Sequence, residues 1–162
     1  VKAYHRISQI IDQQMQRIKA LNRDRDTDLM DKIAAVPLFN GLSEQVLARL
    51  SAHAHSVSLL AGDIIIGEGD KGDALYIIRK GSAEVRRSVP PGEQTVIGKL
   101  GGEDFFGEMA LMGNHVRSAS VIAVTDMSLL RLTRHDVLLV AEEFAEVRRR
   151  LEQVRDHRLA GD

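Results

Sequence analysis

The sequence contains no cysteine, no excess of charge of either sign and no long apolar run. Without cysteine the chain has no disulfide, no thiolate metal ligand and no cysteine nucleophile, which is compatible with a reducing compartment. The 22 Lys and Arg residues balance the 23 Asp and Glu residues, so no overall field attracts nucleic acid or an anionic membrane. Any anion site must therefore be local.

The longest apolar stretches, at 57–60 and 137–141, are far shorter than the roughly 18 to 20 residues of a membrane helix. The chain begins with Val1 rather than Met and carries no signal-peptide pattern, so we expect it to be part of a longer protein. Its 162 residues are 44% hydrophobic and 28% charged, typical of a globular protein. We expect one domain with appended helices.

Residues 4–21 form an amphipathic helical pattern, because residues on one face recur at alternating spacings of three and four. These are Tyr4, Ile7, Ile11, Gln14, Ile18 and Leu21. Gln14 and the short length disfavour a sustained coiled coil. The helix either packs against the domain or serves as a linker that transmits motion or pairs subunits.

The polar segment 22–28 predicts a break, which divides the chain into a linker helix at 1–27 and a domain at 28–162. Asp28 is predicted to cap a helix at 29–35, which Pro37 ends. Ser43 is predicted to start the next helix. This helix is expected to place His53 and His55 on different sides, so no metal site is predicted.

Between residues 56 and 133 the pattern changes to short β-type runs separated by glycine-containing turns. The runs are 57–60, 64–66, 75–78, 83–87, 95–100, 120–124 and 128–132. Helical patterns return at 135–140, after a possible Thr133 cap, and at 142–159. The order predicts an α+β fold: an antiparallel, eight-stranded, jelly-roll-like β-roll with N-terminal helices and C-terminal helices at about 134–159.

Residues 102–119, between two predicted strands, hold the most informative motif. Gly107 permits a close backbone approach, and the helical turn after it offers free amides that suit a phosphate. Arg117 adds a fixed positive charge that can grip phosphate oxygens bidentately. Glu108 accepts hydrogen bonds and repels phosphate, so it must face donors such as sugar hydroxyls. The pattern indicates a phosphorylated ribose, with the Ser118 hydroxyl near the phosphate or the base.

The run FFGEMAL, followed by Arg117-Ser118-Ala119, resembles the phosphate-binding cassette of the cyclic-nucleotide-binding domain family. This family includes regulatory subunits of the cAMP-dependent kinase, bacterial transcription activators and cyclic-nucleotide-gated channels. The segment 62–85 also resembles the family's roll. One departure is Val116, where many relatives have proline, so the loop into Arg117 is less preorganised.

The resemblance implies that Gly107 and Glu108 hold the ribose, and that Arg117 and the Ala110 amide hold the cyclic phosphate. The full predicted ligand-binding set is Gly107, Glu108, Met109, Ala110, Arg117 and Ser118. The last helix is implied to be a lid, with Val154, Arg155 and Arg158 as candidate base contacts. The implied ligand is cAMP or cGMP, and Ser118 leaves both open. No cofactor, metal or catalytic residue is predicted.

We therefore expect a non-catalytic, cytoplasmic regulatory domain that passes lid closure to an attached effector. The preferred effector is a membrane ion channel or a cation/proton antiporter, because this sequence holds no helix-turn-helix module after the lid. The alternatives are the sensing part of a transcription regulator and a structural roll without ligand. The Arg148-Arg149-Arg150 run is interleaved with glutamates, so no nucleic-acid partner is predicted. Oligomeric state, with homo-oligomers possible, and the direction of the response stay open.

Overall fold

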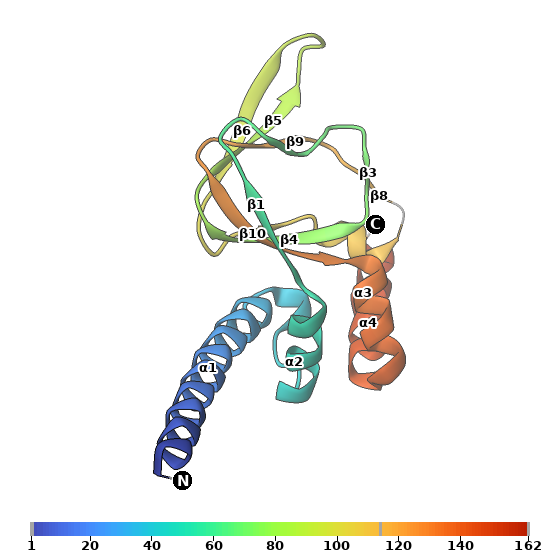
Figure 1. Ribbon diagram of the computed structural model, residues 1–162. Helices are drawn as coiled ribbons and strands as arrows, with labels where there is room; N and C mark the ends of the chain where they lie inside the picture. The colour runs from blue at the N-terminus through green and yellow to red at the C-terminus, as the bar shows by residue number, and fades with distance from the viewer. Residues whose placement is uncertain (1, 114, 162) are drawn as a thin grey trace.

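The computed structural model describes the backbone of residues 2–113 and 115–161 and the side chains of residues 6–18, 28–113 and 116–154. Helices precede and follow a β-roll along the chain, and Figure 1 shows both groups of helices below the roll, on the same side of it. The helical segments are α1 Lys2–Ala34, η1 Pro37–Phe39, α2 Glu44–His53, η2 Glu108–Met112, α3 Arg134–Glu143 and α4 Ala145–Gly161. The strands are β1 His55–Leu59, β2 Ile64–Ile66, β3 Lys71–Gly72, β4 Ala74–Lys80, β5 Ala83–Ser88, β6 Gln94–Leu100, β7 Phe105–Phe106, β8 His115–Val116, β9 Ser120–Ala123 and β10 Met127–Thr133.

Two four-stranded antiparallel sheets make up the roll, in the orders β1-β10-β4-β7 and β2-β9-β5-β6. The short β3 and β8 pair with each other beside them. The predicted α+β class and eight-stranded roll are confirmed. The sequence pattern missed β3, β7 and β8, because a two-residue strand has no periodicity to detect.

Strands β4 and β10 separate two apolar clusters, since successive side chains of a strand point to opposite faces. On one face, Leu75 and Ile77 of β4 pack with buried residues of the helices; we call this cluster the helical core. On the other face, Ile78 of β4 and Leu129 of β10 pack inside the roll; we call this cluster the roll core. The sheet β1-β10-β4-β7 therefore joins the helices to the interior of the roll.

Helix α1 is continuous over 33 residues, so the predicted break at 22–28 and the separate helix capped by Asp28 are wrong. The segment contains neither glycine nor proline, and its Arg and Asp residues are compatible with a helix interior. Instead, the Asp28 carboxylate forms an ion pair with Arg79 of β4, with 3.4 Å between Oδ2 and Nη2. The helix ends at Ala34, and Figure 1 shows it projecting away from the roll.

The predicted caps of α2 and α3 are confirmed. The Ser43 hydroxyl accepts from the amide of Val46 at 3.4 Å. Thr133 and Asp136 form a reciprocal capping box at the start of α3. The last helix begins at Ala145 rather than near 142, because Phe144 is extended and separates α3 from α4.

His53 and His55 lie beside one carboxylate, so the prediction that they face different sides is wrong. The chain leaves α2 after His53 and enters β1 at His55, which brings their ring nitrogens to 3.8 and 3.6 Å from the Asp136 carboxylate. Within the described residues no three His, Asp or Glu side chains form a group suited to a metal ion. None of the described helices has the length and apolar character needed to cross a bilayer.

Candidate ligand site

A cavity of about 360 Å³ opens between the roll and the segment 105–109. Its lining includes five of the six predicted ligand-binding residues: Gly107, Glu108, Met109, Arg117 and Ser118. Ala110 is fully buried behind them, and its amide donates to the carbonyl of Gly107 at 3.0 Å. The phosphate contact of this amide stays a prediction.

Gly107 turns the chain from β7 into η2 with a φ of 86°, a region that disfavours side chains. A Cβ atom at this position would lie 2.6 Å from the Ala74 carbonyl oxygen and 2.9 Å from Nη1 of Arg117. After the turn, the buried Leu111 anchors η2 in the helical core. Glycine is therefore required both for the turn and for the close approach of Arg117.

Arg117 is only 8% exposed although it carries a charge. Its backbone amide donates to the Asp70 carbonyl at 2.8 Å, and its Nη2 donates to the Ala74 carbonyl at 2.9 Å. Burial lowers the pKa of the guanidinium, while Tyr76 and Asp73 act in the opposite direction. An arginine remains charged near neutral pH, so the cavity wall carries a buried, oriented cation.

Gly72 of β3 is a site residue that the sequence analysis missed. A Cβ atom there would overlap Nε and Cζ of Arg117 and lie 2.6 Å from Nη2. The guanidinium thus occupies the space that Gly72 and Gly107 leave by lacking side chains. The β3–β8 pairing, which joins Lys71 to Val116, brings Gly72 to this place. Val116 itself is 58% exposed in β8.

Glu108 is half-buried in the cavity wall, and within the described part of the chain no donor is hydrogen-bonded to its carboxylate. Ser118 is exposed at the cavity, and its carbonyl accepts from Nε of Arg87 at 3.2 Å. The carboxylate therefore offers acceptor oxygens to a hydroxyl-bearing ligand, on the same cavity as the guanidinium.

The remaining walls are mainly apolar, and sequence reasoning did not select them. They comprise Ile66, Val85, Leu100, Phe105, Phe106, Ala119 and Val121. The Phe106 ring stacks on Tyr76 with centroids 5.2 Å apart. Alternation along the strands was the available signal, but it does not separate a cavity wall from a packed core. Such a chamber suits a flat, poorly hydrated ring system.

The predicted lid residues lie on α4. Val154 is half-buried and packs against the helical core, alongside Leu151. The side chains of Arg155 and Arg158 lie outside the described residues. Contact of these three residues with a base stays a prediction.

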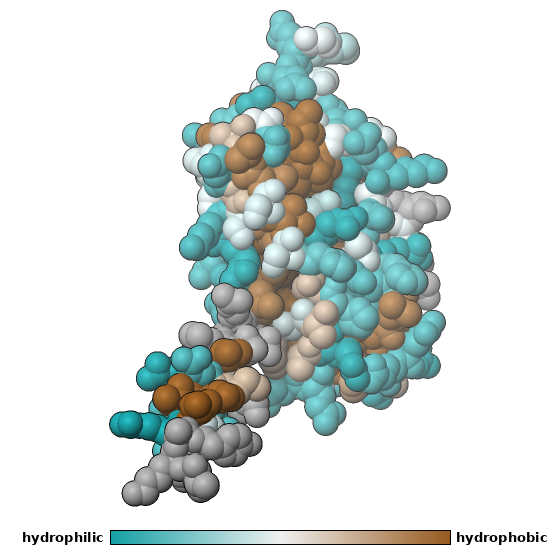
Figure 2. Space-filling view, viewed as in Figure 1, coloured by the Kyte–Doolittle hydropathy of each residue, from teal (hydrophilic) through white to brown (hydrophobic). Residues whose placement is uncertain are grey.

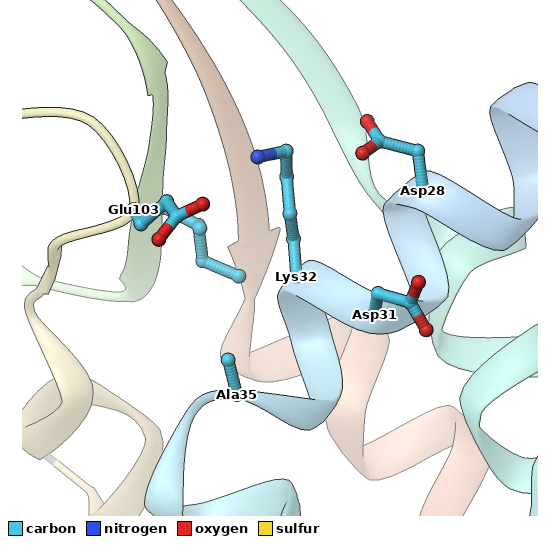
Figure 3. Close-up of a pocket in the computed structure, with 6 residues that line it drawn as sticks. Asp28, Asp31, Lys32, Ala35 and Glu103 are labelled. Carbon is cyan, nitrogen blue, oxygen red and sulfur yellow. The ribbon is translucent and has the colours of Figure 1, made fainter.

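A second cavity, of about 300 Å³, lies where α1 meets the roll. Its lining is largely charged, with Asp28, Asp31 and Lys32 from α1 and Glu103 from the turn before β7. Figure 3 shows the Lys32 side chain extending between Asp28 and the turn that carries Glu103. None of the predicted ligand-binding residues lines it. This cavity marks the junction of α1 with the roll.

Comparison with known proteins gives a consistent assignment. The cyclic nucleotide-binding domain family model matches residues 56–144, more than half of the chain. A cAMP-dependent protein kinase regulatory subunit of Mycosarcoma maydis is 40% identical over 99 residues, 60% of this chain and 19% of that protein. A cyclic nucleotide-gated potassium channel of Mesorhizobium japonicum is 36% identical over 115 residues, 71% of this chain and 30% of the channel.

Among solved structures, the N-terminal domain of a transcriptional regulator from Streptomyces coelicolor A3(2) matches with a TM-score of 0.72 and 30% identity. The match covers 80% of this chain and 91% of that one. The chain spans less than a third of either curated relative above. The matched family, the roll and the cassette with its buried arginine agree: the chain belongs to the cyclic nucleotide-binding domain family.

Proposed function

We propose that this chain binds cAMP or cGMP in the 360 Å³ cavity and reports its occupancy to an attached effector. The observation that carries the proposal is the buried Arg117 guanidinium, which shares the cavity with the Glu108 carboxylate and an apolar chamber. A guanidinium suits the cyclic phosphate, a carboxylate accepts from the ribose hydroxyl, and apolar walls shelter the purine. Ser118, exposed at the cavity, is the proposed contact to phosphate or base.

The proposed role is binding rather than catalysis. The cavity wall is mainly aliphatic and aromatic, and its charged groups, Arg117 and Glu108, suit recognition of phosphate and hydroxyl. Chemistry on the phosphate would also need an activated nucleophile or water. Chromatography of the ligand after incubation tests this role, and conversion to the linear nucleotide would overturn it.

Two contacts support transmission from the cavity to the C-terminal helices. The Arg134 amide, at the start of α3, donates to the Asp73 carbonyl at 2.7 Å, next to the Ala74 carbonyl that accepts from Arg117. Leu111 of η2 lies in the helical core with residues of α3 and α4. We propose that ligand binding draws α4 over the base. A ligand shifts such an equilibrium only if it binds the closed state better than the open one.

The proposed effector is a membrane ion channel or a cation/proton antiporter, with this domain on its cytoplasmic side. The similarity to a potassium channel over 71% of this chain supports that assignment. The alternative is the sensing part of a transcription regulator, favoured by the Streptomyces coelicolor structure. The length and content of the full gene product would distinguish them.

Calorimetric titration of cAMP and of cGMP tests the ligand assignment. We expect saturable binding that Arg117→Ala weakens at least about thirtyfold, because removing one partner of a buried charged contact costs about 2–5 kcal/mol. The control is Arg49→Ala, an exposed arginine that is paired with Glu143 at 2.8 Å and does not line the cavity. Thermal melts confirm that both variants fold. Absence of heat with both nucleotides would favour a structural roll, and equal binding by the Arg117→Ala variant would refute the phosphate role.

A further inference from the structure

Helix α1 carries an apolar face that no described residue covers. Figure 1 shows the helix extending from the domain, and Figure 2 shows apolar side chains gathered on it. The members of this face, which we call the α1 stripe, are each more than half exposed: Ile7 57%, Ile10 51%, Ile11 56%, Met15 52% and Ile18 53%. Within the described residues, the alternative of a helix packed along its length on its own domain is therefore wrong for this segment.

The spacing of the α1 stripe follows a heptad repeat. Ile11 and Ile18 fall seven residues apart at one core position, a, and Ile7 falls at the other, d. Gln14 takes the second d position and is also exposed. In parallel coiled coils a β-branched residue such as isoleucine at a favours two strands, with the apolar seam of one helix against the seam of the other.

The residues that flank the seam also fit a parallel pair. In such a pair a g residue lies beside the e residue five positions later in the other helix. Here Ile10 is at g and Met15 at e, so both exposed apolar side chains that lie off the core positions would meet each other. Between Ile7 and Ile18 the one charged residue in the sequence at an a, d, e or g position is Arg17, at g. The e position five residues later is Asn22, so no like charges would oppose across the seam.

Gln14 favours a second copy of the same chain over an unrelated apolar surface. A side-chain amide carries both donors and an acceptor, so two glutamines at the same level can hydrogen-bond to each other. Against lipid or a wholly apolar partner the amide would be left unpaired at a cost. A polar residue at one core position typically sets register at the expense of stability.

We propose that residues 7–18 of α1 pair with the same residues of a second copy as a short, parallel, in-register helix pair. The segment is less than two heptads long and contains Gln14, so the pair is weaker than a sustained coiled coil. The interface brings Ile11 opposite Ile11 and Ile18 opposite Ile18 of the other copy. Its function is to hold two nucleotide-binding domains side by side. The inference is independent of the ligand assignment, since it depends on α1 alone.

The chain contains no cysteine, so single cysteine substitutions report its pairing without background. We expect Ile11→Cys and Ile18→Cys to form disulfide-linked dimers on mild oxidation, because facing a positions bring the Cα atoms within the roughly 4.4–6.8 Å that a disulfide spans. The control is Gln16→Cys, exposed on the outer f position. It is expected to cross-link at least tenfold more slowly at the same protein concentration.

Cross-linking of both a-position variants, and not of the control, supports the parallel register. An antiparallel pair aligns at most one of the two positions with itself, so cross-linking of only one variant overturns the proposal. Equal rates for all three overturn it as well. Sedimentation of the cysteine-free chain gives a second readout: Ile11→Asp is expected to abolish a concentration-dependent dimer while leaving nucleotide binding and the melting of the roll unchanged. A monomer at all concentrations contradicts the proposal.

Discussion

Gly72→Ala provides the sharpest test of how the site holds Arg117. Gly72 has a φ that any residue adopts, so alanine brings no backbone strain. Its Cβ would overlap Nε and Cζ of the Arg117 guanidinium. The guanidinium is the end of a flexible side chain and is expected to swing aside rather than unfold the strand pair. The substitution therefore moves one charge without removing it.

The expected losses of stability and of nucleotide affinity in the Gly72→Ala variant follow from the contacts that Arg117 loses when it moves. The Nη2 hydrogen bond to the Ala74 carbonyl, 2.9 Å long, breaks, and the displaced cation regains water. The folded state should lose no more than about 1–2 kcal/mol. Nucleotide affinity should fall roughly ten- to a hundredfold, about 1.4–2.8 kcal/mol, because the guanidinium is no longer preorganised to bind the phosphate.

Calorimetry on a double-mutant cycle separates positioning from general damage. We expect Gly72→Ala to add almost nothing to the loss in the Arg117→Ala background, because both changes remove the same contact. The matched control is Gly101→Ala, whose Cβ would meet nothing within 4 Å and whose φ is also ordinary. If Gly72→Ala binds as tightly as the unmodified chain, or if the two losses add in full, the positioning argument is refuted.

Three further predictions concern stability, each measured by urea denaturation. Thr133→Ala removes the capping box of α3 and should lower the free energy of unfolding by about 0.5–2 kcal/mol; no change would mean that the cap is redundant. Burial alone would raise the pKa of Asp136, but hydrogen bonds from Thr133 and the nearby His55 and His53 hold it below its usual value. The folded pKa is thus below the unfolded value of about 3.9, so the stability advantage over Asp136→Asn should be present at about pH 5 and shrink as pH falls below about 4. An advantage that grows on acidification would contradict the assigned direction. Leu130→Ala in the helical core should cost about 2–5 kcal/mol, whereas Leu60→Ala, 67% exposed, should cost less than about 0.5 kcal/mol; similar costs would contradict the assigned burial.

The parts of the fold that the sequence predicts are those with local signals. The seven longer strands show alternation or apolar runs bounded by glycine, and Ser43 and Thr133 mark helix starts through their own hydroxyls. The charged and polar residues at 22–28 led to the wrong prediction of a helix break. Acidic and basic residues are compatible with a helix interior, and the segment holds no glycine or proline that would end the helix. The α3–α4 boundary depends on the extended backbone of Phe144, for which the sequence offers no glycine or proline.

The ligand site likewise contains residues that the sequence reveals and residues that only the fold reveals. Gly107, Glu108 and Arg117 fall within one short stretch, so their joint spacing is visible in the sequence. Gly72 lies 45 positions before Arg117, and only the β3–β8 pairing reveals that its missing side chain makes room for the guanidinium. The Ala74 carbonyl is a backbone group, which no residue pattern specifies. Long-range contacts of this kind require the fold before they can be identified.

Strand β4 links Arg117 by contact to helices from both ends of the chain. Its first carbonyl, that of Ala74, accepts from Arg117, and the preceding carbonyl of Asp73 accepts from the first amide of α3. Further along, Ile77 lies in the helical core and also lines the cavity at the junction with α1. In the proposed response, a shift of Arg117 toward a phosphate would displace β4, because a close-packed interior transmits strain. The proposed transmission therefore has β4 as its carrier, because the strand contacts both the start of α3 and the base of the helix that bears the α1 stripe.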